Sequence, residues 1–236
     1  MLLIRPNLVQ PNHQDLQSQD STNGQSMSPN PIRVGIIGLG TSSTALAAGA
    51  WAALAHLPAL LSSPKYKIVA LANSSVSSAE QSINHHSLPS SVKAYGSPED
   101  IAADPDVDLI VCSVVVTKHY MLTQPALLAG KDVYVEWPLG ATTSEAQELM
   151  SLAREHGVRT VVGLQARADP LVVKIKELVE SGKIGKVISS NVVGAFVGYP
   201  AAWPDNATYY LDANSGGNSL FVYYGHCRSI HFLQLQ

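Results

Sequence analysis

The stretch Ile32-Arg33-Val34-Gly35-Ile36-Ile37-Gly38-Leu39-Gly40 decides the fold of this chain. Its first six residues are mostly β-branched and apolar, which favours a buried strand, and the following glycines permit a tight turn. An alanine- and leucine-rich stretch from Thr44 to Leu61 then predicts a helix. A strand, a glycine turn and a helix in this order are typical of a site that holds phosphate at the helix N-terminus.

The alternation of strand and helix continues along the chain. Further strands are predicted at residues 67–72, 107–114, 132–136 and 160–164, and further helices at 77–86, 119–129 and 143–156. The run from 107 to 114 is almost continuously apolar, as in a strand buried on both faces of a parallel sheet. Strands separated by helices imply right-handed βαβ units. We therefore expect an α/β fold, a Rossmann doubly wound parallel sheet, over residues 32–166.

The two ends of the chain differ from this central part. Residues 6–30 are mostly polar and poor in apolar side chains, which predicts that residues 1–31 form a disordered tail. Residues 167–236 predict a truncated α+β second domain, with a helix at 170–181, a strand at 187–197, a loop at 198–218 and a helix at 219–234. Because the strand has few potential partners nearby, we expect it at an exposed edge, mobile, or covered by a partner or second copy.

Composition and charge argue against several classes of protein. Of the 236 residues, 46% are hydrophobic and 14% charged, and the net charge of −3 includes 15 scattered Lys and Arg residues. We therefore expect no direct nucleic-acid binding and no membrane association, and no metal site is predicted. The first five residues are too short for a signal peptide. Cys112 lies in an apolar run, which suits a reducing compartment. The expected location is the cytoplasm, or the nucleus if the protein is a regulator.

The glycine turn predicts a pyrophosphate site. Gly38 makes the tight turn, Gly40 lets the backbone approach the phosphates, and Ser43 takes the third position of the fingerprint, which governs helix–strand packing. The residues expected to contact the pyrophosphate are Gly38, Leu39, Gly40, Thr41, Ser42 and Ser43. The alternative is an ordinary strand–helix turn that binds no ligand.

The end of the second predicted strand bears on the choice of cofactor. An NAD-preferring protein usually places an acidic residue here, on the ribose 2′-hydroxyl. This chain has Asn73 and Ser74, followed by Ser75, so no charge repels a 2′-phosphate. The cofactor predicted is NADP or NAD, with a lean toward NADP; the alternative is a plain loop.

Two motifs, at residues 134–140 (Tyr-Val-Glu-Trp-Pro-Leu-Gly) and at residues 216–226 (Gly-Gly-Asn-Ser-Leu-Phe-Val-Tyr-Tyr-Gly-His), resemble those of the glucose–fructose oxidoreductase, inositol dehydrogenase and rhizopine-catabolism (Gfo/Idh/MocA) family. Residues 134–140, Tyr-Val-Glu-Trp-Pro-Leu-Gly, resemble its Glu-Lys-Pro segment, in which the lysine helps to polarise the substrate oxygen; Trp137 replaces that lysine. Residues 216–226 resemble its second motif, in which a histidine transfers a proton. That histidine corresponds to His226, but the aspartate four residues before it is replaced by Val222.

Within the family, the chain is most similar to the branch of fungal galactose-regulon repressors, which also has Val-Glu-Trp at this point. Residues 113–120, 164–167 and 224–226 extend the resemblance. It implies a cis bond before Pro138 and further cofactor contacts from Ser113, Val114, His119, Glu136, Trp137, Pro138, Gln165 and Arg167. Relatives continue into an open mixed sheet that often makes a dimer, so a homodimer is one assembly expected.

Two functions follow from these observations. The first is an NAD(P)-binding oxidoreductase with a degenerate site, acting by hydride transfer on a sugar, polyol or secondary-metabolite hydroxyl or carbonyl, with His226 catalytic. The alternative is a non-catalytic NAD(P)-binding transcriptional regulator. Trp137 cannot donate a charged hydrogen bond and Val222 cannot orient His226, and such losses typically cost orders of magnitude in rate. The expected partners are nicotinamide dinucleotide and either a small polar substrate or a regulatory protein. A remnant that binds cofactor poorly is a third possibility.

Overall fold

The computed structural model describes residues 30–42, 49–191, 193 and 205–235. The predicted tail, apart from its last two residues, lies outside the described residues. So do Ser43 and the first part of the helix predicted from Thr44.

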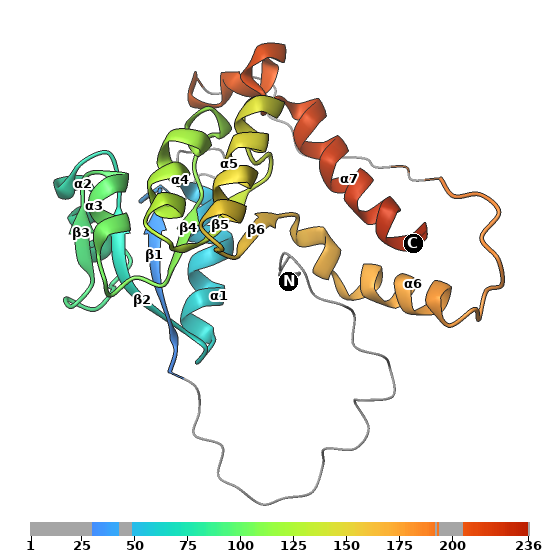
Figure 1. Ribbon diagram of the computed structural model, residues 1–236, viewed down its shortest axis with the longest axis horizontal. Helices are drawn as coiled ribbons and strands as arrows, with labels where there is room; N and C mark the ends of the chain where they lie inside the picture. Colours follow the sequence, from blue (N-terminus) through green and yellow to red (C-terminus); the bar gives the residue numbers. More distant parts are fainter. Residues whose placement is uncertain (1–29, 43–48, 192, 194–204, 236) are drawn as a thin grey trace, which may run out of the picture.

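Six parallel strands form one sheet in the order β3-β2-β1-β4-β5-β6 (Figure 1). They are β1 (Ile32–Ile37), β2 (Tyr66–Ala72), β3 (Lys93–Tyr95), β4 (Leu109–Cys112), β5 (Asp132–Glu136) and β6 (Thr160–Gly163). This is the doubly wound order with its switch point between β1 and β4. The predicted Rossmann sheet is confirmed, although β4 is shorter than the strand predicted over 107–114 and β3 was not predicted.

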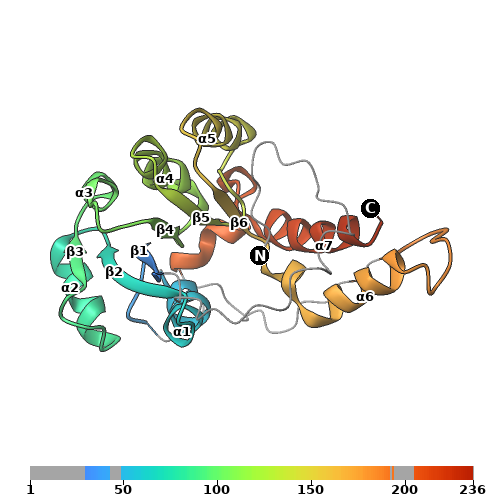
Figure 2. The ribbon, with the colours of Figure 1, turned by 60° about the horizontal axis from the view of Figure 1, so that its bottom comes forward.

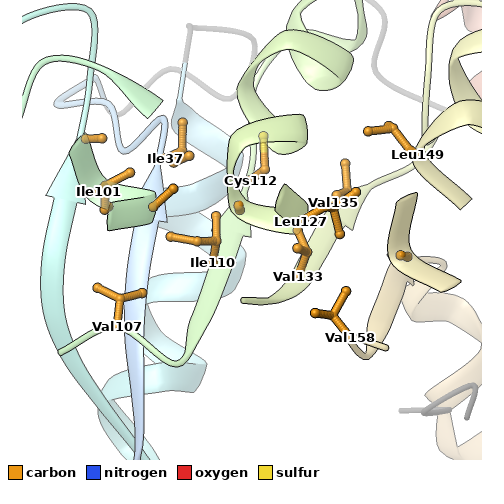
Figure 3. Packing of buried hydrophobic residues seen from close by; sticks show 14 of the residues in the cluster. Ile37, Ile101, Val107, Ile110, Cys112, Leu127, Val133, Val135, Leu149 and Val158 are labelled. Carbon is orange, nitrogen blue, oxygen red and sulfur yellow. The ribbon is translucent and has the colours of Figure 1, made fainter. Parts of the chain in front are cut away.

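Helices cover both faces of the sheet. They are the π-helix η1 (Ala52–His56), α1 (Leu57–Ser62), α2 (Val76–His85), α3 (Pro98–Ala103), η2 (Val116–Lys118), α4 (His119–Leu128), α5 (Thr143–Glu155) and η3 (Gln165–Ala168). Helices α3, α4 and α5 lie on one face and α1 and α2 on the other (Figure 2). Alternate residues of β5 divide between the two layers: Val133 and Val135 pack toward α4 and α5 (Figure 3), and Tyr134 packs with the α1 layer.

The C-terminal region begins with α6 (Pro170–Glu180) and ends with α7 (Ser219–Leu235), as predicted for both helices. The two helices contact each other and η3, beyond the β6 edge of the sheet (Figures 1 and 2). Two short helices, η4 (Asp205–Leu211) and η5 (Ala213–Ser215), occupy part of the stretch predicted as a loop; residues 198–204 lie outside the described residues.

The strand predicted at 187–197 is wrong in its described part, because residues 187–191 and 193 form no strand. The side chains of Ile188 and Val193 are apolar, yet these residues are 94% and 88% exposed. A strand needs a neighbour for its backbone hydrogen bonds, and none of the described strands pairs with this segment. Residues 192 and 194–197 lie outside the described residues.

The amino ends of the strands surround an open hollow in which charges are paired. Arg33 at the start of β1 holds Asp108 at 2.7 Å, and the Arg159 Nε donates to Asp132 at 2.8 Å. The Arg33 hydrogen bonds outweigh partial burial and hold the pKa of Asp108 below its usual range. These pairs fasten neighbouring strand ends together, at the edge opposite the glycine turn.

Candidate dinucleotide site

The glycine turn after β1 is in close contact with the end of β4. Gly38 has a φ of +94°, and a Cβ on it would lie 2.3 Å from Val114 Cγ1 and 2.7 Å from the Ser113 carbonyl oxygen. Only glycine fits this conformation and this contact. The turn therefore brings Gly38, Ser113 and Val114 together, as the predicted site requires.

A third glycine, Gly49, packs the following helix onto the turn. It has a φ of +72°, and a Cβ there would lie 2.3 Å from the Gly40 nitrogen and 2.6 Å from the Gly38 oxygen. The Gly40 N–H donates to the Gly49 carbonyl at 3.2 Å. This close packing is the role expected for Ser43, which lies outside the described residues. The signal that identifies Gly49 is a glycine directly before Ala-Trp-Ala-Ala, the start of the described helix.

Side chains near β2 and α2 hold the carbonyls of the turn. The Leu39 carbonyl accepts hydrogen bonds from Asn73 Nδ2 at 3.1 Å and from Ser82 Oγ at 2.8 Å, and His86 Nε2 lies 2.7 Å from the Gly40 carbonyl oxygen. Leu39 itself is fully buried. The conformation of the turn is thus fixed from the α2 side before any ligand binds.

The residues expected at the ribose have different roles in the structure. The Asn73 amide group is engaged by the Leu39 and Ser78 carbonyls and by Ser82 Oγ. Ser75 caps α2 by accepting a hydrogen bond from the Ser78 N–H. Ser74 is exposed. Asn73 therefore supports the turn, and Ser75 supports α2.

A buried polar cluster surrounds Glu136 at the carboxyl end of β5. The Glu136 carboxylate accepts hydrogen bonds from His56 Nε2 at 2.5 Å, Gln165 Nε2 at 2.8 Å and the Tyr134 hydroxyl at 3.2 Å. Gly163, its neighbour on β6, leaves room for the cluster, because a Cβ there would lie 2.8 Å from Glu136 Oε2. Of these residues, His56 and Tyr134 were missed by sequence reasoning.

The hydrogen bonds keep the Glu136 carboxylate ionised. Burial on its own would raise the pKa of Glu136, but the His56, Gln165 and Tyr134 hydrogen bonds outweigh it, and the pKa falls below its usual value. Burial and the neighbouring carboxylate conversely raise the pKa of the Tyr134 hydroxyl, which stays protonated. The ionised Glu136 carboxylate is therefore the centre of the cluster, and His56 is its ion-pair partner.

Trp137 joins the sheet to α7. Its Nε1–H donates to the Phe221 carbonyl at 3.1 Å, and its ring lies on Gly225, where a Cβ would be 2.3 Å from two indole atoms. The bond between Trp137 and Pro138 is cis, as predicted. The indole therefore lies beneath the helix turn that precedes His226, in place of the family's lysine.

His119 connects two loops at the same edge of the sheet. Its Nδ1 lies 2.7 Å from the Pro138 carbonyl oxygen and its Nε2 3.0 Å from that of Val114. Burial lowers the pKa of His119 more than the two carbonyl contacts raise it. This histidine fixes backbone rather than facing an open site.

His226 is half-buried on α7. Burial lowers its pKa, and the negative charge of Glu136 opposes that shift. Val222, one helical turn earlier, offers no polar atom to orient the ring. Arg167 lies half-buried in η3, beside the Gln165 that contacts Glu136.

Among the helices of the described residues, none has the length and apolar character that crossing a membrane requires. The same residues contain no group of three or more His, Cys, Asp or Glu side chains placed to hold a metal ion.

Comparison with known proteins assigns the class of this fold and site. Residues 32–164 match the model of the oxidoreductase family with an NAD-binding Rossmann fold, the Gfo/Idh/MocA family, and residues 170–234 match the C-terminal domain of Gal80p. The chain belongs to the Gfo/Idh/MocA oxidoreductase family and carries a Gal80-like C-terminal region.

Its relatives include both a dehydrogenase and regulators. The chain is 39% identical over 165 residues to dehydrogenase aclE of Aspergillus oryzae, an alignment covering 69% of this chain and 43% of aclE. It is 34% identical over 208 residues to the galactose/lactose metabolism regulatory protein GAL80 of Kluyveromyces lactis, covering 84% of this chain and 44% of that protein. The chain thus spans less than half the length of these relatives.

Solved structures similar to this chain also include both a regulator and an oxidoreductase. A super-repressor mutant of Gal80p from Saccharomyces cerevisiae superposes with a TM-score of 0.76 at 29% identity, covering 86% of this chain and 53% of that one. The 3-ketoreductase KijD10 of Actinomadura kijaniata, solved with NADP, gives a TM-score of 0.54 at 25% identity, covering 66% and 46%. The predicted resemblance to the galactose-repressor branch is confirmed.

Proposed function

We propose that this chain binds NADP or NAD across the carboxyl edge of its sheet, as a dinucleotide-binding regulator without the usual hydride-transfer chemistry of its family. The observation that carries the proposal is Trp137. Its indole fills the position of the family's lysine and hydrogen-bonds to α7, so no charged donor stands there to polarise a substrate oxygen.

The residues present fit a dinucleotide. The glycine turn at residues 38–40 is held rigid by α2, and the helix behind it packs at Gly49. The backbone N–H groups at the start of that helix are the usual partners of a pyrophosphate. Ser74 beside the ribose position carries no charge, which is compatible with the 2′-phosphate of NADP. Bound dinucleotide would supply a nicotinamide ring to the far half of the edge, where β4 and β5 end.

Titration calorimetry with NADP⁺, NADPH, NAD⁺ and NADH tests dinucleotide binding. Gly49→Ala should weaken every complex by about tenfold or more, because its Cβ would lie 2.3 Å from the Gly40 nitrogen in a backbone conformation that disfavours alanine. Gly157→Ala is the matched control, since Gly157 also has a positive φ but a Cβ there would meet nothing within 4 Å. Absence of binding by the unmodified chain would refute the proposal.

An oxidoreductase is the second candidate, favoured by His226. Its ring is neutral at pH 7 because burial lowers its pKa, and a neutral imidazole can accept a proton from a substrate hydroxyl. The 39% identity to a dehydrogenase supports the same candidate. Incubation with NADP⁺ or NAD⁺ and a panel of polyols and sugars would decide it: turnover that disappears in His226→Ala establishes the enzyme, and no turnover by a chain that binds dinucleotide supports the regulator.

A further inference from the structure

The turn after β1 uses two of its own N–H groups inside the protein. The Gly38 N–H donates to the Ala72 carbonyl at 3.1 Å. The Gly40 N–H donates to the Gly49 carbonyl at 3.2 Å. Thr41, the next residue, is exposed, and its N–H meets no acceptor among the residues that the structure describes. The turn can therefore offer a ligand the N–H of Thr41, but not those of Gly38 and Gly40.

The direction of the Thr41 N–H follows from the carbonyl on the other side of the same peptide bond. The Gly40–Thr41 bond is trans, and the C=O and N–H of a planar trans peptide point in opposite directions. His86 Nε2 lies 2.7 Å from the Gly40 carbonyl oxygen. Because a carbonyl oxygen can only accept, the ring nitrogen is the donor. The Gly40 carbonyl thus faces the end of α2, and the Thr41 N–H faces away from it.

His86 is the contact that holds this peptide plane. Glycine has no Cβ, so the backbone torsions at Gly40 are less restricted than those of other residues. The neighbouring Leu39 carbonyl has two side-chain donors, whereas within the described ranges only His86 donates to the Gly40 carbonyl. Without that hydrogen bond, the Gly40–Thr41 peptide would be free to rotate and to turn its N–H inward.

Resting on the proposed function, we propose that His86 is a positioning residue for dinucleotide binding. It acts through the turn, by keeping the Thr41 N–H directed outward, where an oxygen of the pyrophosphate accepts it. The backbone of His86 is itself fixed, because its N–H ends α2 by donating to the Ser82 carbonyl at 3.0 Å. The affinity for a dinucleotide then depends on a side chain 46 residues away from Gly40 in the sequence.

Calorimetric titration with NADP⁺ and NAD⁺ tests this role. His86→Leu removes the donor and should weaken both complexes by about tenfold, the order of magnitude of a hydrogen bond to a charged group. His86→Gln, whose amide can still donate to the Gly40 carbonyl, should restore most of that affinity. His156→Leu is the matched control and should bind as the unmodified chain does. His156 ends α5 with the same pattern of backbone hydrogen bonds as His86 at the end of α2, but it is exposed.

A second measurement separates positioning from a general effect on stability. In the unmodified chain, the ¹H resonance of the Thr41 amide should move downfield on saturation with NADP⁺, because the N–H then donates to a phosphate oxygen. In saturated His86→Leu the movement should be smaller. A purely structural role would lower stability but leave the resonance of the bound form unchanged. Should His86→Leu fail to fold, His86→Asn takes its place, because its amide is too short to reach the Gly40 carbonyl.

The outcomes separate this inference from the proposed function. If the unmodified chain binds neither dinucleotide, the proposed function fails and the positioning role fails with it. If the unmodified chain binds, three results would overturn the positioning role alone. These are equal affinity in His86→Leu, an equal loss of affinity in His156→Leu, and the same movement of the Thr41 resonance in His86→Leu as in the unmodified chain.

Discussion

Substitution of Gly225 by alanine tests the contact between Trp137 and α7. Gly225 lies inside α7, where alanine is intrinsically favoured over glycine by about 1 kcal/mol. Propensity alone therefore predicts that Gly225→Ala stabilises the protein. The structure predicts the opposite, because the new Cβ would lie 2.3 Å from Trp137 Cε2 and Nε1.

The magnitude can be worked from these distances. Carbon atoms in contact prefer separations of about 3.5–4.0 Å, so α7 or the indole must move by about 1 Å or more. Such overpacking costs about 1–3 kcal/mol, and movement also weakens the Trp137–Phe221 hydrogen bond, worth about 1 kcal/mol. After the propensity gain, the net loss is about 2 kcal/mol. For a chain of this length, that lowers the Tm by about 4–8 °C.

Thermal denaturation, with hydrogen exchange over residues 219–235, measures the effect. Leu220→Ala is the control on the same helix: Leu220 is 71% exposed, so its truncation should change stability little. In a Trp137→Ala background the clash is absent, and Gly225→Ala should then become neutral or stabilising. A Gly225→Ala protein as stable as the unmodified chain, or more stable, would refute the reasoning.

Two further substitutions test other parts of the structure. Asn73→Ala removes donors to the buried Leu39 carbonyl and should lower the free energy of unfolding in urea by about 1–2 kcal/mol, whereas Ser74→Ala, at an exposed position, should not. Asp108→Asn tests the pairs at the amino edge of the sheet. The Arg33 hydrogen bonds lower the pKa of Asp108 in the folded state. The ionised carboxylate therefore contributes its full stabilisation above the ordinary carboxyl pKa of 3.8, and this stabilisation is lost as pH falls through the lower folded-state pKa. At pH 7 the free energy of unfolding of the variant should be lower by about 0.5–1 kcal/mol, a small value because both partners are partly exposed. Below pH 4 the variant should lose stability less steeply than the unmodified chain. The same pH dependence of stability below pH 4 in both proteins would contradict this prediction.

Most strands of the sheet could be predicted from the sequence. The prediction failed where an element was short or where a strand needed a neighbouring strand. β3 has three residues and one of them, Lys93, is charged, so it reads as loop; α3 has only six residues. The segment from 187 carries strand-forming residues, but propensity acts only where a neighbouring strand accepts the pairing. The described part of that segment has no such neighbour.

The candidate site likewise has one part that a local sequence motif predicts and another that depends on residues far apart in the sequence. Gly38 and Gly40 belong to a local motif, so the turn could be predicted from adjacent residues. The partners of Glu136 could not, because His56 lies 80 residues away in sequence. Likewise Asn73 was assigned to the ribose from its position after β2, but its contact with Leu39 depends on how α2 packs, which no local pattern encodes.

The π-helical stretch η1 limits how the helix before β2 can change. A π-helix carries more residues per turn than an α-helix and is what one extra residue produces within a regular helix. Because the wider winding absorbs the extra residue, the residues on either side of η1 keep the directions that they would have in a regular α-helix. Deleting one residue between 50 and 55 should therefore restore α-helical winding and leave His56 facing Glu136. Adding one residue that the helix cannot absorb would instead turn His56 by about 100° and leave the Glu136 carboxylate without its shortest hydrogen bond. The segment before β2 thus tolerates a change of length in one direction only, and the limit is set by a side chain on β5.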